Sequence, residues 1–218
     1  MKNNKSIIAV IALLAIIVIS IYAYKVNSDN NTDDMSNNSS QQSTNMGSVD
    51  KTSSEYIMYN SLTGRNYDQM FLANMIAHHQ GAVDMANLAL TNAKHQEIKD
   101  MANNIISAQT TEIKNMETWQ EEWGYPSSSG VMMEDHSSMG MMDSMASMTA
   151  SLEGLSGDEF DKAFLSSMIE HHQSAINMSY PGQFNAEHEE VKELTKAIVN
   201  AQSSEITQMQ QWQKDWQY

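Results

Sequence analysis

Apolar side chains recur at helical spacing in several parts of the chain. Residues 71–86 follow the three- and four-residue steps of an amphipathic helix, and residues 98–119 repeat the pattern. The second run stops before Gly124 and Pro126, which are typical of helix ends. We place the cap of the second helix at or near Asn92. This part of the chain is therefore predicted to form a pair of helices.

A second pair of helices is expected in the C-terminal part. The residues from Ser156 to Glu159 have the spacing of a capping box, which marks a helix start. Pro181 and Gly182 separate this helix from the next. No stretch after residue 55 alternates convincingly between apolar and polar positions, so no strand is predicted.

The two pairs of helices are related by an internal repeat. His78 and His79, in Met-Ile-Ala-His-His-Gln, are matched 93 residues later by His171 and His172, in Met-Ile-Glu-His-His-Gln. The same offset aligns further residues without a gap, including Asp68 with Asp161, Phe71 with Phe164, His95 with His188, Trp119 with Trp212 and Trp123 with Trp216. We interpret this as a duplication. Neither hairpin can bury its apolar face alone, so the prediction is an all-α, four-helix bundle built from two duplicated helical hairpins.

The N-terminus has the pattern of a membrane anchor. Lys2 and Lys5 precede an apolar run over residues 7–23, close to the length needed to span a bilayer. The end of the run offers no small-x-small cleavage site, which favours an N-terminal transmembrane helix over a cleaved signal peptide. The lysines are expected in the cytoplasm, with the rest of the chain outside, at the cell surface or in the periplasm.

These patterns divide the chain into five segments. The Ser- and Asn-rich segment after the anchor has almost no apolar side chains and is predicted to be a disordered tether. The segments are the anchor at 1–25, the tether at 26–54, the first hairpin at 55–124, a Met-rich linker at 125–156 and the second hairpin at 157–218.

Charge and composition narrow the choice of partners. The chain has 12 Lys and Arg against 27 Asp and Glu, a formal charge of −15. Nucleic-acid binding is not expected, because phosphate contacts need clustered basic side chains. An acidic surface attracts cations, although it also serves solubility alone. The absence of Cys excludes disulfides and thiolate metal sites.

The repeated motif places possible metal ligands on one helix face. At about 100° per residue, Met75, His78, His79 and Met85 form one stripe, and their counterparts form a second that can face it. Imidazole suits copper, zinc and iron, whereas thioether sulfur suits Cu(I). The candidate ligands are Met75, His78, His79, Met85, Met168, His171, His172 and Met178.

Other metals and a purely structural role are the alternatives. A di-iron bundle needs Glu-x-x-His motifs, but the residues three before the motif histidines are methionine or isoleucine. Neither a His-Glu-x-x-His motif nor a cysteine site exists for zinc. Methionine at helical spacing is usually a core filler. Burying four imidazoles without partners is costly, however, so we favour a functional site.

Residues on the second helix of each hairpin can support the histidines. Glu112 and Glu205 are candidates to orient them by hydrogen bonds, although either could equally be a cap or a surface carboxylate. Their neighbours Gln109, Gln202, Met116 and Met209 are further candidates for this supporting role. His95 and His188 are expected to be capping or exposed residues and at most secondary ligands. The tryptophan pairs are expected to pack the bundle ends.

The Met-rich linker is a second candidate copper site. Seven of the 19 methionines lie between Met132 and Met148, separated by small and polar residues. A flexible tract of this kind can wrap Cu(I) with soft donors. The alternative is a Met-rich amphipathic helix that covers the bundle or binds a partner. The candidate ligands are Met132, Met133, His136, Met139, Met141, Met142, Met145 and Met148.

The repeated motif resembles that of the DUF305 family. The resemblance rests on Met-Ile-x-His-His-Gln followed by Met85, and on the later Gln109, Glu112, Met116 and Trp119 with their counterparts. It covers about residues 66–123 and 159–216. The family commonly has Pro before the histidine pair, where this chain has Ala77 and Glu170. The resemblance implies a ferritin-like fold and copper binding through the Met/His motifs.

The predicted function is extracytoplasmic copper binding, for sequestration, resistance or trafficking, with copper ions as the expected ligand and any trafficking partner protein unspecified. One alternative is an enzyme that oxidises Cu(I) or Fe(II) at the same site. Another is a helical module that binds no metal and serves a structural or partner-binding role. The lack of Glu-x-x-His disfavours iron oxidation, so catalysis is the less favoured hypothesis.

Overall fold

The computed structural model describes residues 47–126 and 136–218. The predicted anchor and residues 26–46 of the predicted tether lie outside these ranges. Within the two described ranges, no helix is both long enough and apolar enough to cross a membrane.

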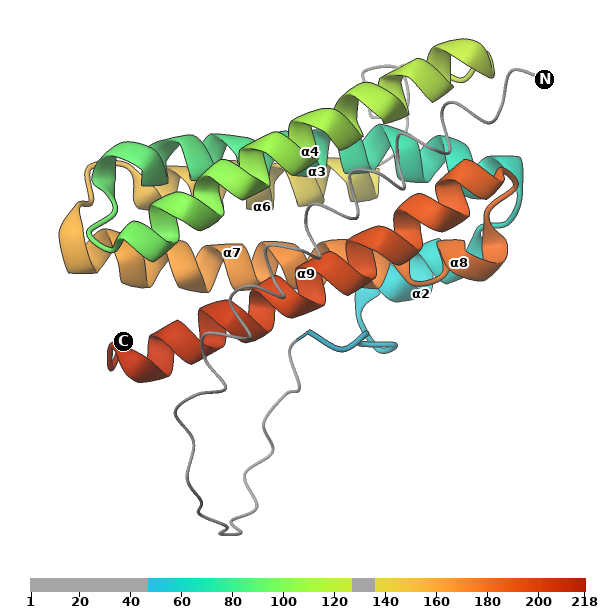
Figure 1. Cartoon of the computed structure of the whole chain (residues 1–218). Helices are drawn as coiled ribbons and strands as arrows, with labels where there is room; N and C mark the ends of the chain where they lie inside the picture. The colour runs from blue at the N-terminus through green and yellow to red at the C-terminus, as the bar shows by residue number, and fades with distance from the viewer. Residues whose placement is uncertain (1–46, 127–135) are drawn as a thin grey trace, which may run out of the picture.

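Four long helices dominate the structure (Figure 1). They are α3 (Arg65–Asn92), α4 (Gln96–Glu122), α7 (Gly157–Ser179) and α9 (Glu189–Asp215). Shorter helices accompany them: α2 (Ser54–Ser61), α6 (His136–Leu152) and α8 (Gly182–Asn185). Every regular element in the described ranges is a helix, apart from two isolated β-bridges. The predicted all-α bundle is confirmed.

The long helices form two hairpins that pack on each other. Helix α3 lies along α4, helix α7 lies along α9, and the two hairpins meet between α3 and α7. The break in the first hairpin differs from the prediction: α3 continues to Asn92, and the residue that caps α4 is His95. Ser156 does cap α7, but its side chain makes no capping hydrogen bond.

Contacts between the hairpins come in pairs related by the 93-residue offset. One bridge joins Gly64 to Ala186, and the other joins Ala93 to Gly157. The two short flanking helices also cross over, because α2 packs on α7 while α6 packs mainly on α3. Tyr59 of α2 and Leu152 of α6 hold corresponding positions, and both are fully buried. Each hairpin is therefore covered by the segment that precedes the other.

The linker and the end of the tether are more ordered than the sequence suggested. Residues 136–152 form α6 and not an irregular loop. Met145, Met148 and Leu152 have the i, i+3, i+7 spacing of a buried face, which explains why a Met-rich segment with small polar residues packs on the bundle. At the other end, the backbone of Gly47 and Asp50 donates hydrogen bonds to Gln173 and Asn177 of α7.

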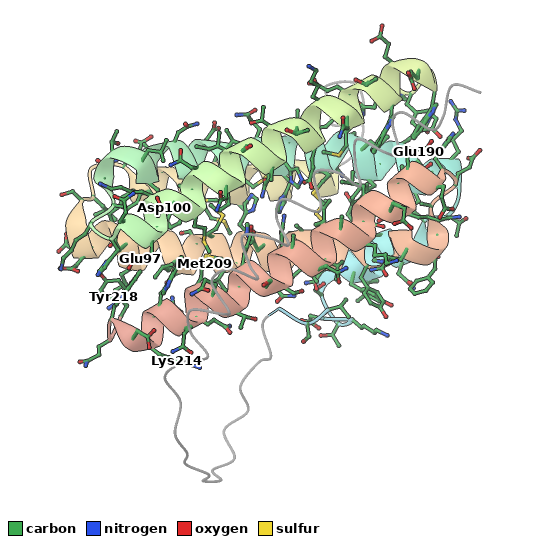
Figure 2. All side chains as sticks on the ribbon, viewed as in Figure 1. Glu97, Asp100, Glu190, Met209, Lys214 and Tyr218 are labelled. Carbon is green, nitrogen blue, oxygen red and sulfur yellow. The ribbon has the colours of Figure 1, made fainter. Side chains whose placement is uncertain are left out.

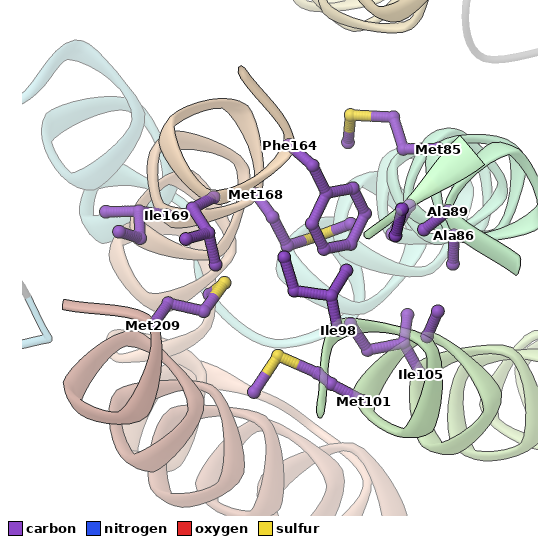
Figure 3. Close-up of a cluster of buried hydrophobic side chains, with 14 of the residues drawn as sticks. Met85, Ala86, Ala89, Ile98, Met101, Ile105, Phe164, Met168, Ile169 and Met209 are labelled. Carbon is purple, nitrogen blue, oxygen red and sulfur yellow. The ribbon is translucent and has the colours of Figure 1, made fainter. Parts of the chain in front are cut away.

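Side chains fill the space between the helices (Figure 2), and the buried apolar ones form two clusters. The first includes Phe164 and four methionines, Met85, Met101, Met168 and Met209. The thioethers of these methionines pack among Ile, Ala and Phe side chains (Figure 3). The second includes residues that correspond by the offset: Tyr67, Phe71, Met75, Met116, Met178 and Leu194. Burial of these side chains supplies the main driving force for the fold.

Candidate metal centre

A layer of polar side chains separates the two apolar clusters. Along α3, the second cluster extends to Ile76 and the first begins at Ala82. His78 and His79 lie between them, at 1% and 0% exposure. His171 and His172 occupy the corresponding part of α7, with the same exposures. The four predicted histidines therefore lie in the middle of the bundle.

The second helix of each hairpin adds an acid to this layer. Nε2 of His79 lies 2.7 Å from Oε2 of Glu112, and Nε2 of His172 lies 2.7 Å from Oε2 of Glu205. Each carboxylate is partly buried and accepts a hydrogen bond from the imidazole N–H. The hydrogen bonds predicted for these glutamates are present. Because Nε2 donates in both pairs, Nδ1 is the ring nitrogen that remains available to bind a metal.

The other two histidines meet across the interface between the hairpins. The rings of His78 and His171 are 3.7 Å apart between centroids and are inclined at 45°. Nε2 of His171 donates to the backbone oxygen of His78 at 3.0 Å. Burial is the main reason that the pKa of both imidazoles is lowered well below the usual 6.5, and repulsion from neighbouring histidines adds to it. Both rings are therefore neutral at pH 7.

All four imidazoles keep one ring nitrogen without a partner. Nδ1 of His78, His79, His171 and His172 is buried and makes no hydrogen bond to any described residue. Buried polar atoms of this kind are uncommon, because losing water without a replacement costs free energy. Neutral imidazole nitrogens are also metal ligands. The layer can therefore donate four nitrogen lone pairs to a cation.

The nitrogens are not yet arranged as a closed metal site. Among the described residues, no group of three or more His, Cys, Asp or Glu side chains is placed to hold one ion. The glutamine side chains of the layer, Gln109 and Gln202, are buried, and Oε1 of each has no partner within the described ranges. Ligation of one ion by several of these histidines requires ring rotation.

The predicted thioether ligands lie outside the polar layer. Met75 and Met178 are fully buried in the second apolar cluster, and Met85 and Met168 in the first. Met116 and Met209, the other candidates on the second helices, are buried in the same clusters. The structure thus brings the histidines together and places these methionines on either side of them.

The candidate copper ligands of the linker lie partly on α6 and partly outside the described residues. Met132 and Met133 lie outside the described residues, whereas His136, Met139, Met141 and Met142 belong to the first turns of α6. Met145 is buried at 7% exposure, and Met148 packs partly buried against the first apolar cluster. Of these two methionines, the ones whose side chains the structure describes, Met145 is the one that approaches the histidine layer, beside His171.

His95 and His188 have a structural part at the ends of the bundle. Each is the N-cap of its helix, and its Nδ1 hydrogen bonds to a fully buried aspartate of the other hairpin, Asp161 or Asp68, at 2.6 and 2.7 Å. His95 also stacks on Trp216, and His188 on Trp123. The expected capping position and the packing role of the tryptophans are both present.

The sequence interpretation missed the two aspartates. Asp68 also accepts the backbone N–H groups of Glu187 and His188, and Asp161 accepts those of Lys94 and His95. The signal was available, because Asp68 lies in the first turn of α3, Asp161 lies just after the first turn of α7, and the offset pairs the two acids. Their role is to join the start of one hairpin to the middle of the other.

Comparison with known proteins identifies the family. No protein with a curated functional description matches the chain significantly. The solved structure of CopM in its Cu(II)-bound form is 37% identical, with a TM-score of 0.58, and the match covers 68% of this chain and 97% of that one. The Cu(I)-bound form of CopM matches at the same identity, with a TM-score of 0.56 and coverage of 68% and 96%.

A DUF305 protein from Streptomyces coelicolor, described as secreted, is 27% identical with a TM-score of 0.59, and the match covers 68% and 92% of the two chains. The family model described as "Domain of unknown function (DUF305)" matches residues 68–213, which include both histidine pairs and both supporting glutamates. The chain therefore belongs to the DUF305 family.

Proposed function

We propose that this protein binds copper ions through the histidine layer of its bundle. The observation that carries the proposal is the set of four buried imidazoles, each with an Nδ1 that has no partner among the described residues. The copper-bound structures of CopM, which share this fold at 37% identity, support the choice of metal.

The histidines would hold the ion, and the glutamates would orient them. A carboxylate that accepts a hydrogen bond from the Nε2–H group fixes the tautomer of the ring and makes Nδ1 a stronger metal ligand. This arrangement exists at His79 with Glu112 and at His172 with Glu205. Met75, Met85, Met168 and Met178 flank the layer and would approach the ion only if their side chains rotate out of the apolar clusters.

We infer a role in copper sequestration, resistance or trafficking outside the cytoplasm. The expected N-terminal anchor, the acidic charge and the secreted relative from Streptomyces coelicolor support this placement. We also propose that the bundle is of the ferritin-like four-helix type and arose by duplication, which the paired contacts between the hairpins support.

Metal titration of the purified full-length chain tests the proposal. We expect copper to outcompete zinc and Fe(II), because the described polar layer combines imidazoles with few carboxylates. A variant with leucine at His78, His79, His171 and His172 should lose Cu(II) binding while keeping its helical content.

Met101→Leu is the control for general disturbance of the core, because Met101 lies in the first apolar cluster and outside the polar layer. It should bind copper as the parent does. Full Cu(II) binding by the four-histidine variant would overturn the proposed site, and a preference for zinc or Fe(II) in competition would overturn the choice of metal.

A further inference from the structure

Met145 is a buried methionine that belongs to neither apolar cluster. It is the only buried methionine among the residues of α6 whose side chains are described, and its neighbours Asp143, Ser144, Ala146 and Ser147 are exposed. Leu152 and Met148 of the same helix pack in or against the first apolar cluster, but Met145 belongs to neither cluster. Its thioether faces the polar layer instead.

Gly81 creates the space that Met145 enters. A methyl group at Gly81 would lie 3.3 Å from Sδ of Met145 and 3.5 Å from Nε2 of His171. The sulfur and the nitrogen therefore line the same small volume, which is open because residue 81 has no side chain. A side chain at residue 81 would enter this volume.

The corresponding place in the other hairpin lacks this arrangement. The offset of 93 residues sets Ser174 against Gly81 and Thr52 against Met145. There, α7 is crossed by residues 47–50, whose backbone hydrogen bonds to the side chains of Gln173 and Asn177. Ser174 itself donates to Sδ of Met178, a residue of α7. The two sides therefore differ in the segment that crosses the helix: a methionine of α6 packs against Gly81 of α3, whereas backbone groups of residues 47–50 bind amide side chains of α7.

We propose that Met145 is a copper ligand beside His171 and makes this side of the site selective for Cu(I). The inference rests on the proposed function of the histidine layer. Thioether sulfur is a soft donor that strengthens binding of Cu(I), and of Ag(I), far more than binding of Cu(II). At this side of the site His171 would bind the ion through Nε2 and not through Nδ1. The ring proton then moves to Nδ1, which has no partner among the described residues, and the hydrogen bond to the carbonyl oxygen of His78 is lost.

Replacing Met145 with Leu removes the sulfur while keeping an apolar side chain of similar volume. In full-length protein titrated against a chromophoric Cu(I) chelator, we expect affinity for Cu(I) to fall at least about tenfold, with Cu(II) affinity unchanged. X-ray absorption of the Cu(I)-loaded protein should lose sulfur scattering relative to the parent. Met101→Leu is the matched control, because Met101 is a methionine of the first apolar cluster outside the polar layer, and it should change neither readout.

Gly81→Ala gives an independent test of the geometry. The added methyl group crowds Sδ of Met145, so this variant should weaken Cu(I) binding in the same direction. The methyl group would also lie 3.5 Å from Nε2 of His171, an ordinary contact distance, so in the Met145→Leu background its effect on Cu(I) should be smaller than in the parent. Alanine is a better helix former than glycine, so the helix is retained.

The outcomes separate this inference from the proposed function. If Met145→Leu keeps the Cu(I) affinity and sulfur scattering of the parent while the four-histidine variant loses copper, Met145 is only a packing residue and this inference is wrong. If the four-histidine variant still binds copper fully, the proposed site itself is wrong. Equal loss of Cu(I) and Cu(II) in Met145→Leu would also overturn the proposed selectivity.

Discussion

The four buried histidines differ in their hydrogen-bond partners. His79 and His172 are fixed by carboxylates, whereas His78 and His171 contact each other and a backbone carbonyl. The first pair is therefore oriented before a metal arrives, and the second pair is free to change its hydrogen bonding. These differences lead to two separate predictions.

The carboxylates should matter for metal affinity more than for folding. The double substitution Glu112→Gln and Glu205→Gln keeps a side-chain oxygen that can accept the hydrogen bond from Nε2–H, but it removes the negative charge of each carboxylate. We expect copper affinity to fall about 10- to 100-fold, measured by chelator competition. Glu117→Gln, an exposed change on α4, is the control and should have no effect. Unchanged affinity in the double variant would show that these acids do not act through the histidines.

The buried imidazoles should make the metal-free protein sensitive to acid. The pKa of His78 and of His171 is lowered well below 6.5 in the fold and lies near 6.5 in the unfolded chain. The unfolded state therefore binds more protons below pH 6.5, so the free energy of unfolding is greatest above that pH and falls as the pH drops. Urea unfolding of the metal-free protein between pH 8 and pH 5 measures this.

A variant with leucine at His78 and His171 should show a flatter pH dependence over the same range. An equally steep profile in that variant would assign the acid sensitivity to other groups.

At the scale of elements, helix ends are joined across the hairpins by buried aspartates. Asp161 accepts three N–H groups from Lys94 and His95 and is fully buried. Asp68 does the same for Glu187 and His188. Each link fixes where the second helix of one hairpin begins relative to the first helix of the other.

Asp161→Asn should destabilise the fold, because one carboxylate oxygen becomes a donor facing N–H groups. We expect a loss of about 2–3 kcal/mol in the free energy of unfolding. Asp158→Asn removes a solvent-exposed ion pair with Lys94 and keeps an oxygen for the exposed hydrogen bond from Tyr218, so it should cost at most about 1 kcal/mol. Chemical denaturation of both variants distinguishes them, and similar small losses would mean that the buried link contributes little.

The sequence predicted the helices well and their contacts less well. The spacing of apolar residues located the four long helices, and the histidine pairs were correctly expected to face each other, because one helix face fixes both. Met145 was grouped with a flexible tract, since its small polar neighbours hide the spacing that it shares with Met148 and Leu152. Its approach to Gly81 depends on how α6 crosses α3, which no local pattern encodes.

At the scale of the whole molecule, each half depends on the other. Helix α2 precedes the first hairpin but packs on α7, and α6 precedes the second hairpin but packs mainly on α3. The aspartate links cross in the same way. Neither half should therefore be stable alone, because its apolar faces and buried carboxylates would be left without partners.

This dependence can be tested by cleavage. A protease site placed within residues 127–135, between the two described ranges, should yield fragments that stay together as one particle in size-exclusion chromatography and still bind copper. Either fragment expressed alone should lack a cooperative thermal transition. Separation of the fragments after cleavage without denaturant would contradict the crossed packing.

The crossed packing has a further consequence for how the site can evolve. A protein with one such hairpin would have to form a two-fold symmetric homodimer, and any substitution in it would appear on both sides of the axis at once. In a single chain the two halves mutate independently. Gly81 faces Met145 on one side, and the matching positions on the other side hold Ser174 and Thr52. A homodimer of identical halves could not encode this difference.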